Sequence, residues 1–281
     1  MKHTFLTFSL GVVLLSFSSC SDDKKHYDDV KEELPKGLQL VANTTFGTVL
    51  SDTKGRTLYF FANDADGSSN CNGQCEITWP AYYDADHTSN KDLNPEDIGV
   101  ITRADGKKQS TYKGWPLYYY APDNKVGDVK GDGVGGIWFA GKSDYTIMIA
   151  NTQLIGADGN KYKDELTLGE GITPYFTNGS GRTLYAFTPD TFNKNTYTNE
   201  DFSNDAVWPI YKVEEIKSVP SVIKKDLFTV IDVFGRKQIT YKGRPLYYFG
   251  QDAKRGETKG ISVPRPGVWP IVNLKTSEAP R

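Results

Sequence analysis

The chain contains the same short phrase twice, and this internal repeat limits its fold more than any other feature. Gly-Arg-Thr-Leu-Tyr occurs at residues 55–59 and again at residues 181–185, an offset of 181 − 55 = 126. A longer phrase at residues 108–120 returns at residues 237–249 with few changes, an offset of 237 − 108 = 129. A duplicated sequence predicts a duplicated structure, because each copy can form the same supersecondary units.

A finer motif occurs four times, twice in each copy. It reads Tyr-x-aromatic-x-x-Asp, and a leucine precedes the tyrosine each time. Side chains alternate along a strand, so the tyrosine and the second aromatic residue share one face and the leucine lies on the other. We expect the aromatic residues to pack in the core and the aspartates to accept backbone N–H groups in turns. The alternative is that the repeated tyrosine and aspartate faces form a shared ligand surface. The motif residues are Tyr59, Phe61 and Asp64; Tyr118, Tyr120 and Asp123; Tyr185, Phe187 and Asp190; and Tyr247, Phe249 and Asp252.

The abundance of Tyr (17) and Gly (27), with few long helical patterns, favours an all-β protein with many tight turns. We expect antiparallel strands in two tandem copies, residues 37–143 and 144–281, with four pseudo-repeats. Such units can close into a propeller-like ring or form two packed β-domains. If Leu40 corresponds to Met148, copy two carries 126 − 108 = 18 extra residues, which predict an extended turn or hairpin around residues 156–171.

The N-terminus predicts export and a lipid anchor. An apolar run at residues 5–17 and two small residues precede Cys20, a pattern typical of a secretory signal. Residues 17–20 resemble a bacterial lipobox, which implies a signal peptide at residues 1–19 and membrane attachment through lipid on Cys20. The alternative is an ordinary cleaved signal followed by an unrelated cysteine. Residues 20–36 are polar and charged, which predicts a disordered tether. Their acidic start resembles the surface-export signals of some Gram-negative lipoproteins, so we expect an outer-membrane lipoprotein exposed at the cell surface.

These motifs together resemble a family of secreted repeats of unknown function, also described as predicted lipoproteins with a Yx(FWY)xxD motif. The resemblance covers residues 48–142 and 172–272. Copy two lacks the two cysteines of copy one. The family implies an address outside the cytoplasm and a repeat fold, and it assigns no activity. The residues that carry the resemblance in copy one include Gly55, Arg56, Cys71, Cys75, Trp79, Pro80 and Trp138.

Cys71 and Cys75 are the thiols that remain if Cys20 is lipidated. An oxidising compartment favours a disulfide between them. A redox-active pair has the spacing Cys-x-x-Cys, and this pair is one residue wider. A soft-metal site that adds His87 is the alternative, but a structural zinc site needs four such ligands, and we expect no metal and no cofactor.

Charge and motif content leave the function open. Lys and Arg (33) balance Asp and Glu (35), so no nucleic-acid partner is expected. Trp115 is replaced by Arg244 in copy two, which predicts an exposed Trp115; Trp115 and His87 are the binding candidates. No nucleophile–base pair stands out, so the sequence favours a non-enzymatic binding or scaffold module with an unknown ligand, and an envelope protein or a glycan as partner. The alternatives are a metal- or redox-linked envelope protein that uses the Cys71/Cys75 loop and a carbohydrate-active enzyme, which needs two facing carboxylates about 5–10 Å apart.

Overall fold

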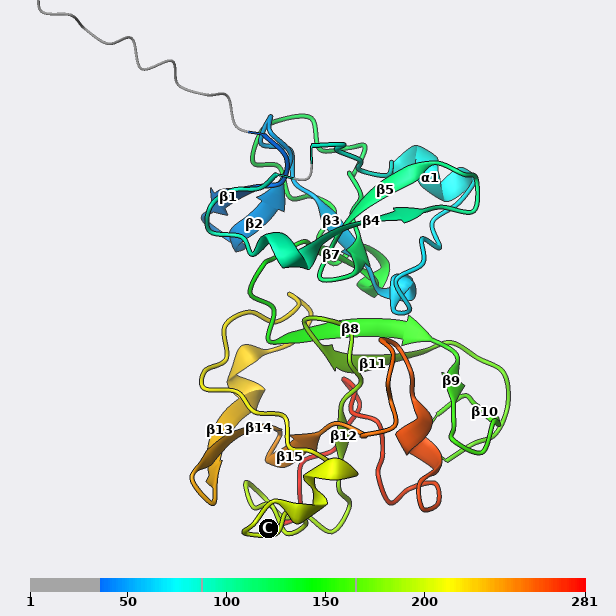
Figure 1. Cartoon of the computed structure of the whole chain (residues 1–281), viewed down its shortest axis with the longest axis vertical. Coiled ribbons are helices and arrows are strands. Elements are labelled where there is room, and N and C mark those ends of the chain that lie inside the picture. Colours follow the sequence, from blue (N-terminus) through cyan, green and yellow to red (C-terminus); the bar gives the residue numbers. More distant parts are fainter. Residues whose placement is uncertain (1–35, 87, 165) are drawn as a thin grey trace, which may run out of the picture. The chain divides into compact units, whose positions relative to one another are not determined.

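The structure is a computed structural model that describes residues 36–86, 88–164 and 166–281 (Figure 1). The predicted signal peptide and all but the last residue of the predicted tether lie outside the described residues. Residues Pro35–Arg281 form one compact unit. The predicted boundary between residues 143 and 144 is not tested by this unit and stays a prediction.

Copy one is built from short antiparallel strands. β1 pairs with β2, β3 pairs with β7, and β5 lies between β4 and β6. The strands are β1 (Gln39–Asn43), β2 (Gly47–Ser51), β3 (Tyr59–Phe61), β4 (Ile98–Thr102), β5 (Lys108–Tyr112), β6 (Trp115–Pro116) and β7 (Trp138–Ala140). The helical segments are α1 (Gln74–Thr78) and the 3-10 turns η1 (Ala62–Asp64), η2 (Pro95–Asp97) and η3 (Val134–Gly136).

Copy two repeats this plan with longer ladders. β8 pairs with β11, β9 with β10, and a four-stranded sheet has the order β12-β15-β14-β13. The strands are β8 (Ile147–Thr152), β9 (Leu154–Ile155), β10 (Lys161–Tyr162), β11 (Thr173–Asn178), β12 (Tyr185–Ala186), β13 (Phe228–Val233), β14 (Arg236–Tyr241) and β15 (Arg244–Tyr247). The 3-10 turns are η4 (Ser203–Ala206), η5 (Lys225–Leu227) and η6 (Lys259–Ser262).

Tight turns set the register of the repeated hairpins. Lys113 and Gly114 connect β5 to β6, and Lys242 and Gly243 connect β14 to β15. All four residues have positive φ, which is the geometry of a two-residue type I′ turn. Glycine at the second position allows this conformation without strain, so the repeated Tyr-Lys-Gly phrase directly encodes a hairpin.

The register corrects the predicted length of the insert by one residue. Leu40 pairs with Leu50, whereas Ile149 pairs with Phe176, the counterpart of Leu50 at an offset of 126. Leu40 therefore corresponds to Ile149 rather than Met148, and the insert is 126 − 109 = 17 residues. The predicted hairpin is confirmed, since β9 and β10 pair within the insert.

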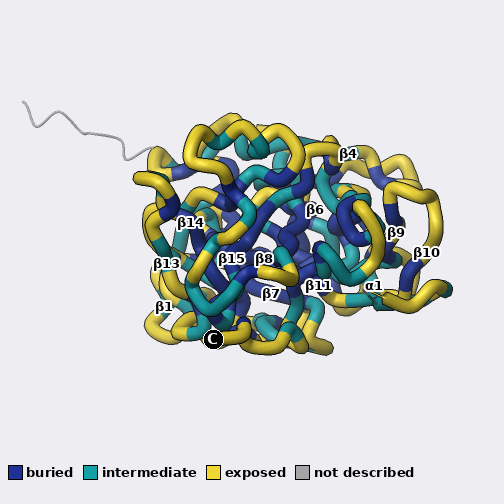
Figure 2. Tube along the Cα trace, turned by 90° about the horizontal axis from the view of Figure 1, so that it is seen from below, coloured by how far each residue is buried: buried dark blue, intermediate teal, exposed yellow. Residues whose placement is uncertain are grey.

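The prediction of an antiparallel all-β fold is confirmed, because all pairs of named strands are antiparallel. The sheets of the described chain form no closed barrel or propeller, so the ring alternative is not found, and the alternative of packed β-units fits the sheets. Buried segments, dark blue in Figure 2, lie inside a layer of exposed loops. The side chains of the first motif alternate between two apolar clusters. Leu58 and Phe60 belong to one cluster, and Tyr59 and Phe61 belong to the other.

Candidate functional site

The motif tyrosines and aspartates bind each other in reciprocal pairs. In copy one, Tyr59 donates a hydrogen bond to Oδ2 of Asp123 (2.5 Å), and Tyr118 donates to Oδ2 of Asp64 (2.6 Å). The two tyrosines also face each other across an antiparallel bridge. Each motif thus supplies the carboxylate for the tyrosine of the other motif.

Copy two contains the same arrangement. Tyr185 donates to Asp252 and Tyr247 donates to Asp190, both at 2.7 Å. Tyr185 and Tyr247 are direct partners in the β12–β15 pairing. The recurrence in both copies shows that the tyrosine–aspartate pair is the conserved unit of the repeat within this chain.

The second carboxylate oxygen of each motif aspartate closes a loop. Oδ1 of Asp64 accepts the backbone N–H of Asn70 (2.7 Å), and Oδ1 of Asp252 accepts that of Lys259 (2.9 Å). Asp123 and Asp190 accept backbone N–H groups in the same way. Burial raises the pKa of Asp64 and of Asp252 to about 7, although the hydrogen bonds oppose this shift. A raised pKa can mark a catalytic acid, but both oxygens of these carboxylates already have structural partners.

Four aromatic rings stack in each copy. In copy one, Trp79 and Trp138 stack with ring centroids 3.8 Å apart, and Phe61 and Tyr120 cover the outer faces. In copy two, Trp208 and Trp269 stack at 3.9 Å between Phe187 and Phe249. The second aromatic residue of every motif therefore packs on a tryptophan, which buries large apolar area without a ligand.

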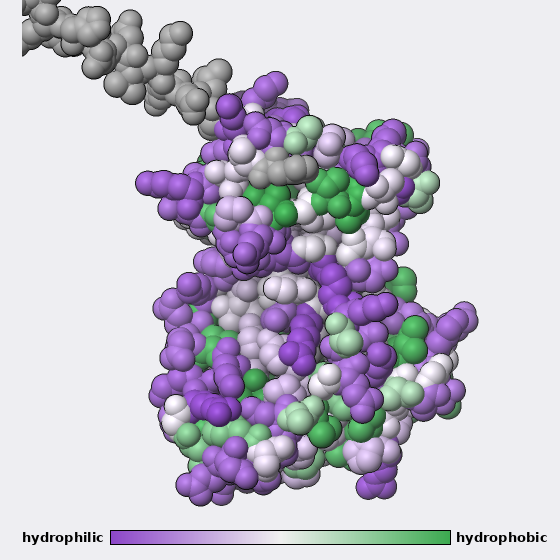
Figure 3. All heavy atoms as spheres, in the orientation of Figure 1, coloured by the Kyte–Doolittle hydropathy of each residue, from purple (hydrophilic) through white to green (hydrophobic). Residues whose placement is uncertain are grey.

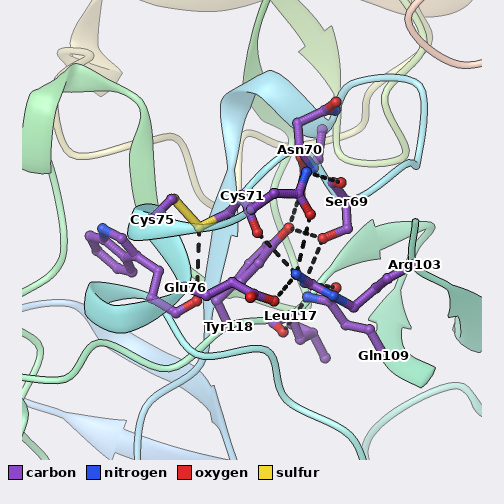
Figure 4. Close-up of a disulfide and its surroundings, with 12 residues drawn as sticks. Ser69, Asn70, Cys71, Cys75, Glu76, Arg103, Gln109, Leu117 and Tyr118 are labelled. Atoms are coloured by element: carbon purple, nitrogen blue, oxygen red, sulfur yellow. Dashed lines mark hydrogen bonds and ion pairs between the residues drawn. A yellow bond between two sulfur atoms is a disulfide. The ribbon is translucent and has the colours of Figure 1, made fainter. Parts of the chain in front are cut away.

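The predicted disulfide is confirmed: Cys71 and Cys75 are bonded, with their Cα atoms 5.3 Å apart (Figure 4). Arg103 lies beneath this loop and is nearly fully buried. Its guanidinium donates to the carbonyl oxygen of Cys71 (3.0 Å) and forms an ion pair with Glu76. The disulfide loop is thus held by Arg103, a buried cation that directly follows β4 and that the sequence did not indicate.

Two glutamines were also missed, although the repeat contains a signal for them. Gln109 and Gln238 occupy the same place in the duplicated phrase, and each is completely buried. Their side-chain amides donate to the carbonyl oxygens of Leu117 and Leu246. A buried polar side chain that recurs at the repeat offset indicates a structural hydrogen bond at that position.

The prediction that Trp115 is exposed is wrong. Its side chain is fully buried, and its Nε1 donates to the carbonyl oxygen of Gly179 (3.0 Å). The guanidinium of Arg255 covers the ring, with its central carbon 4.4 Å from the ring centroid. Trp115 therefore lies in the contact between the two copies and is not available to a ligand. His87, the other binding candidate, and Cys20 lie outside the described residues.

A surface hollow lies between the insert of copy two and the last segment of the chain. Its volume is about 720 Å³, and its lining includes Leu166, Ile172 and Leu274 together with Lys163, Arg244 and Lys275. The three apolar side chains are exposed, with exposed fractions of 64%, 65% and 41%. Elsewhere on the surface, hydrophobic residues form small separate patches among hydrophilic ones on the face seen in Figure 3. The hollow depends on the insert, so copy one has no counterpart for that wall.

No cluster of three or more His, Cys, Asp or Glu residues in the described part of the chain could hold a metal ion. No helix in residues 36–86, 88–164 or 166–281 is long and apolar enough to cross a membrane.

Comparison with known proteins agrees with the repeat. The model of a family described as "secreted repeat of unknown function" matches residues 40–82, 99–142 and 229–273. The third motif, Tyr185 to Asp190, lies outside these matches, so the resemblance expected across residues 172–228 is not seen there; this part of copy two directly follows the insert. The searches of curated proteins and of solved structures found no match. A family of secreted repeats fits a location outside the cytoplasm. Three separate segments of the chain thus match the family of secreted repeats of unknown function, the family that its sequence motifs resemble.

Proposed function

We propose that the protein is a lipid-anchored outer-membrane lipoprotein that displays a non-enzymatic binding module at the cell surface. The lipobox-like residues 17–20 and the acidic residues that follow support the anchor and its outward orientation. Membership in a secreted-repeat family is consistent with this address. In this proposal, the reciprocal motif pairs form the scaffold, and the segments that differ between the copies carry the ligand site.

The observation that carries the binding proposal is the hollow of copy two. Its volume of about 720 Å³ lies within the range of about 300–1,000 Å³ that is common for small-molecule sites. Exposed apolar side chains at a concave site favour a ligand with an apolar part, because its burial removes apolar surface from water. The hollow is absent from the shared repeat and arises from the insert that distinguishes copy two.

The charges in the hollow favour an anionic group on that ligand. Lys163, Arg244 and Lys275 line it, and none of them forms an ion pair with a carboxylate of the described chain. Asp164, the acidic residue in the lining, accepts the backbone N–H groups of Leu166 and Thr167 within its own turn. An amphiphile with an aliphatic chain and a carboxylate therefore matches both the walls and the cations.

The test measures equilibrium binding of a fluorescent long-chain fatty acid to the purified folded chain. Replacing Ile172 and Lys275 by glutamate should weaken binding by about tenfold or more. The matched control replaces Ile77 and Lys224, which are exposed and lie outside the lining, and should leave binding unchanged. Absence of binding, or equal loss in both variants, would reject the fatty-acid site; binding of an oligosaccharide in the same assay would instead favour a glycan ligand.

The anchor is tested separately. Wild-type protein should incorporate labelled palmitate and fractionate with the outer membrane, and a protease added to intact cells should digest it. Cys20→Ala should abolish labelling and release the protein from the membrane. Labelling without digestion in intact cells would support the lipid anchor and reject the orientation toward the cell surface.

The metal- or redox-linked alternative is tested by the native mass of the folded chain. A bound metal that is lost in Cys71→Ser/Cys75→Ser would favour this alternative.

A further inference from the structure

The two copies contact each other through different surfaces. Copy one contributes η1 and the turn that ends at Trp115; we call these the acceptor face. Copy two contributes β8, β11 and the loop that contains Arg255; we call these the donor face. Asn151 on β8 donates to Oδ1 of Asn63 in η1 (2.7 Å), and Arg255 lies on the ring of Trp115. A contact between unlike faces does not close on itself, so repeats that use it can form an open array.

The acceptor face of copy two is covered by the C-terminal end of the chain. Lys242 and Arg244 correspond to Lys113 and Trp115 at the offset of 129. The ammonium of Lys242 donates to the carbonyl oxygens of Leu274 and Thr276, and the Arg244 guanidinium donates to that of Ser277. We call residues 273–281 the C-terminal cap.

The cap continues across the neighbouring turn. The backbone N–H of Phe192 donates to the carbonyl oxygen of Pro280 (2.8 Å), and the guanidinium of Arg281 lies over the Phe192 ring. The residue of copy one that corresponds to Phe192 is Asp66 (192 − 126 = 66), whose backbone lies close to Gly256 of copy two. The acceptor face of copy one is covered by copy two. The cap therefore covers the same face of copy two.

The donor face of copy one has no such cover among the described residues. Ile149 and Ala150 on β8 are almost fully buried, whereas their counterparts Leu40 and Val41 on β1 are partly exposed. Val126 corresponds to Arg255 at the offset of 129 and is 69% exposed. One end of the two-copy array is thus capped. At the other end, the partly exposed Leu40 and Val41, on opposite faces of β1, and the exposed Val126 have no counterpart of the cap among the described residues.

We propose that the β1–β2 face with Val126 is an interaction surface for the acceptor face of another secreted repeat. The contact inside the chain shows how such a pair fits together, because there the donor face of copy two packs on the acceptor face of copy one. Val126 packs against Gly55 as Arg255 packs against Gly181, so the loop has the same placement in both copies. The partner is a repeat whose acceptor face is uncovered, as the acceptor face of copy two becomes when the cap is removed. The C-terminal cap prevents a second copy of this chain from filling that role.

The chain itself provides the probe. Deletion of residues 275–281 uncovers the acceptor face of copy two, and this variant should form concentration-dependent head-to-tail oligomers in sedimentation velocity while the full chain stays monomeric. Adding Val41→Glu and Val126→Glu to the deletion variant should weaken association by about tenfold or more. Phe234→Glu, at an exposed position of the β13–β14 turn, is the control and should not weaken it.

A competing peptide and a second variant complete the test. A synthetic peptide of residues 273–281 should dissociate the oligomers by covering the acceptor face in trans. If the deletion variant does not fold, Phe192→Ala with Arg281→Ala in the full chain loosens the cap and should give the same association. A folded, uncapped variant that remains monomeric at high concentration would overturn the proposal, as would association that the two β1–β2 face substitutions leave unchanged. Neither result depends on ligand binding in the hollow.

Discussion

The hydroxyl of Tyr118 donates a hydrogen bond to Oδ2 of Asp64, while Tyr59 donates to Asp123 in the opposite sense. A single motif therefore cannot satisfy its own buried carboxylate, and the two motifs of a copy are expected to fold together. This reciprocity explains why the motifs occur as pairs and why the aspartate follows the second aromatic residue at a constant distance.

Loss of one hydroxyl from this pair should destabilise copy one. Tyr118→Phe removes the donor to Asp64 and leaves a buried carboxylate oxygen without that partner. The expected loss in the free energy of unfolding is about 1–3 kcal/mol, measured by urea denaturation. Tyr83→Phe is the control, because Tyr83 is 47% exposed and its loss of a hydroxyl should cost little. Equal losses in the two variants would contradict a structural role for the pair.

Stability should fall as the pH rises toward neutrality. Burial raises the pKa of Asp64 and Asp252 to about 7 in the folded chain, from a value of 3.8 for the free side chain. Between these values the unfolded chain releases protons that the folded chain retains, so the free energy of unfolding decreases with increasing pH. Asp64→Asn with Asp252→Asn removes both titrations.

The measurement for this prediction is the free energy of unfolding at intervals from pH 4 to pH 7. The double variant should show a flatter dependence on pH than the wild type, because the remaining groups titrate in both proteins. An unchanged slope would mean that the two carboxylates are ionised in the folded protein throughout this range.

Gly131 tests the close packing around the ring stack. An added Cβ would lie 2.8 Å from Cη2 of Trp79 and 2.9 Å from the Tyr59 ring. Gly131→Ala should therefore cost about 1–3 kcal/mol and change the near-ultraviolet circular dichroism of the stacked rings. Gly136→Ala is the control, since it has positive φ but no neighbour within 4 Å, and should lose about 1–2 kcal/mol without the spectral change. An unchanged spectrum in Gly131→Ala would show that the stack can shift to accept a methyl group.

The sequence could predict the parts of the fold that depend on local pattern. Alternation placed Tyr59 and Leu58 on opposite faces, and secretion with close spacing predicted the bond between Cys71 and Cys75. The Lys-Gly turns and the hairpin in the insert also follow from short-range chemistry. These features are determined by the types of a few residues that are close together in the sequence.

Partners distant in the chain could not be predicted in this way. Asp64 is held by a tyrosine 54 residues away, and nothing in the motif states which tyrosine that is. The change from Trp115 to Arg244 between the copies indicated exposure, but both residues are in contact with other parts of the chain. Trp115 contacts copy two, and Arg244 contacts the C-terminal cap. The hollow likewise depends on how the insert lies beside residues 270–277.

Arg255 provides the last prediction, because its guanidinium is buried without a hydrogen-bond partner in the described chain. Burial lowers the pKa of Arg255 to about 10, although the nearby carboxylates of Asp66 and Asp64 oppose this shift. Its contact with Trp115 can come from the charge or from the side chain's packing. Arg255→Met keeps much of the packing and removes the buried charge, so it should leave stability unchanged or raise it by up to about 2 kcal/mol.

Arg255→Ala removes both the charge and the packing and should lower the free energy of unfolding by about 1–3 kcal/mol, because Trp115 loses its cover. Arg265→Met, at an exposed position, controls for the change in net charge. Urea denaturation followed by tryptophan fluorescence measures all three variants. If Arg255→Met were as unstable as Arg255→Ala, the attraction between the guanidinium and the indole ring would be the term that holds the copies together. If only Arg255→Ala is unstable, the side chain of Arg255 acts through apolar packing. The apolar Val126, at the same position of copy one, can then pack in the same way at the proposed interface with another repeat.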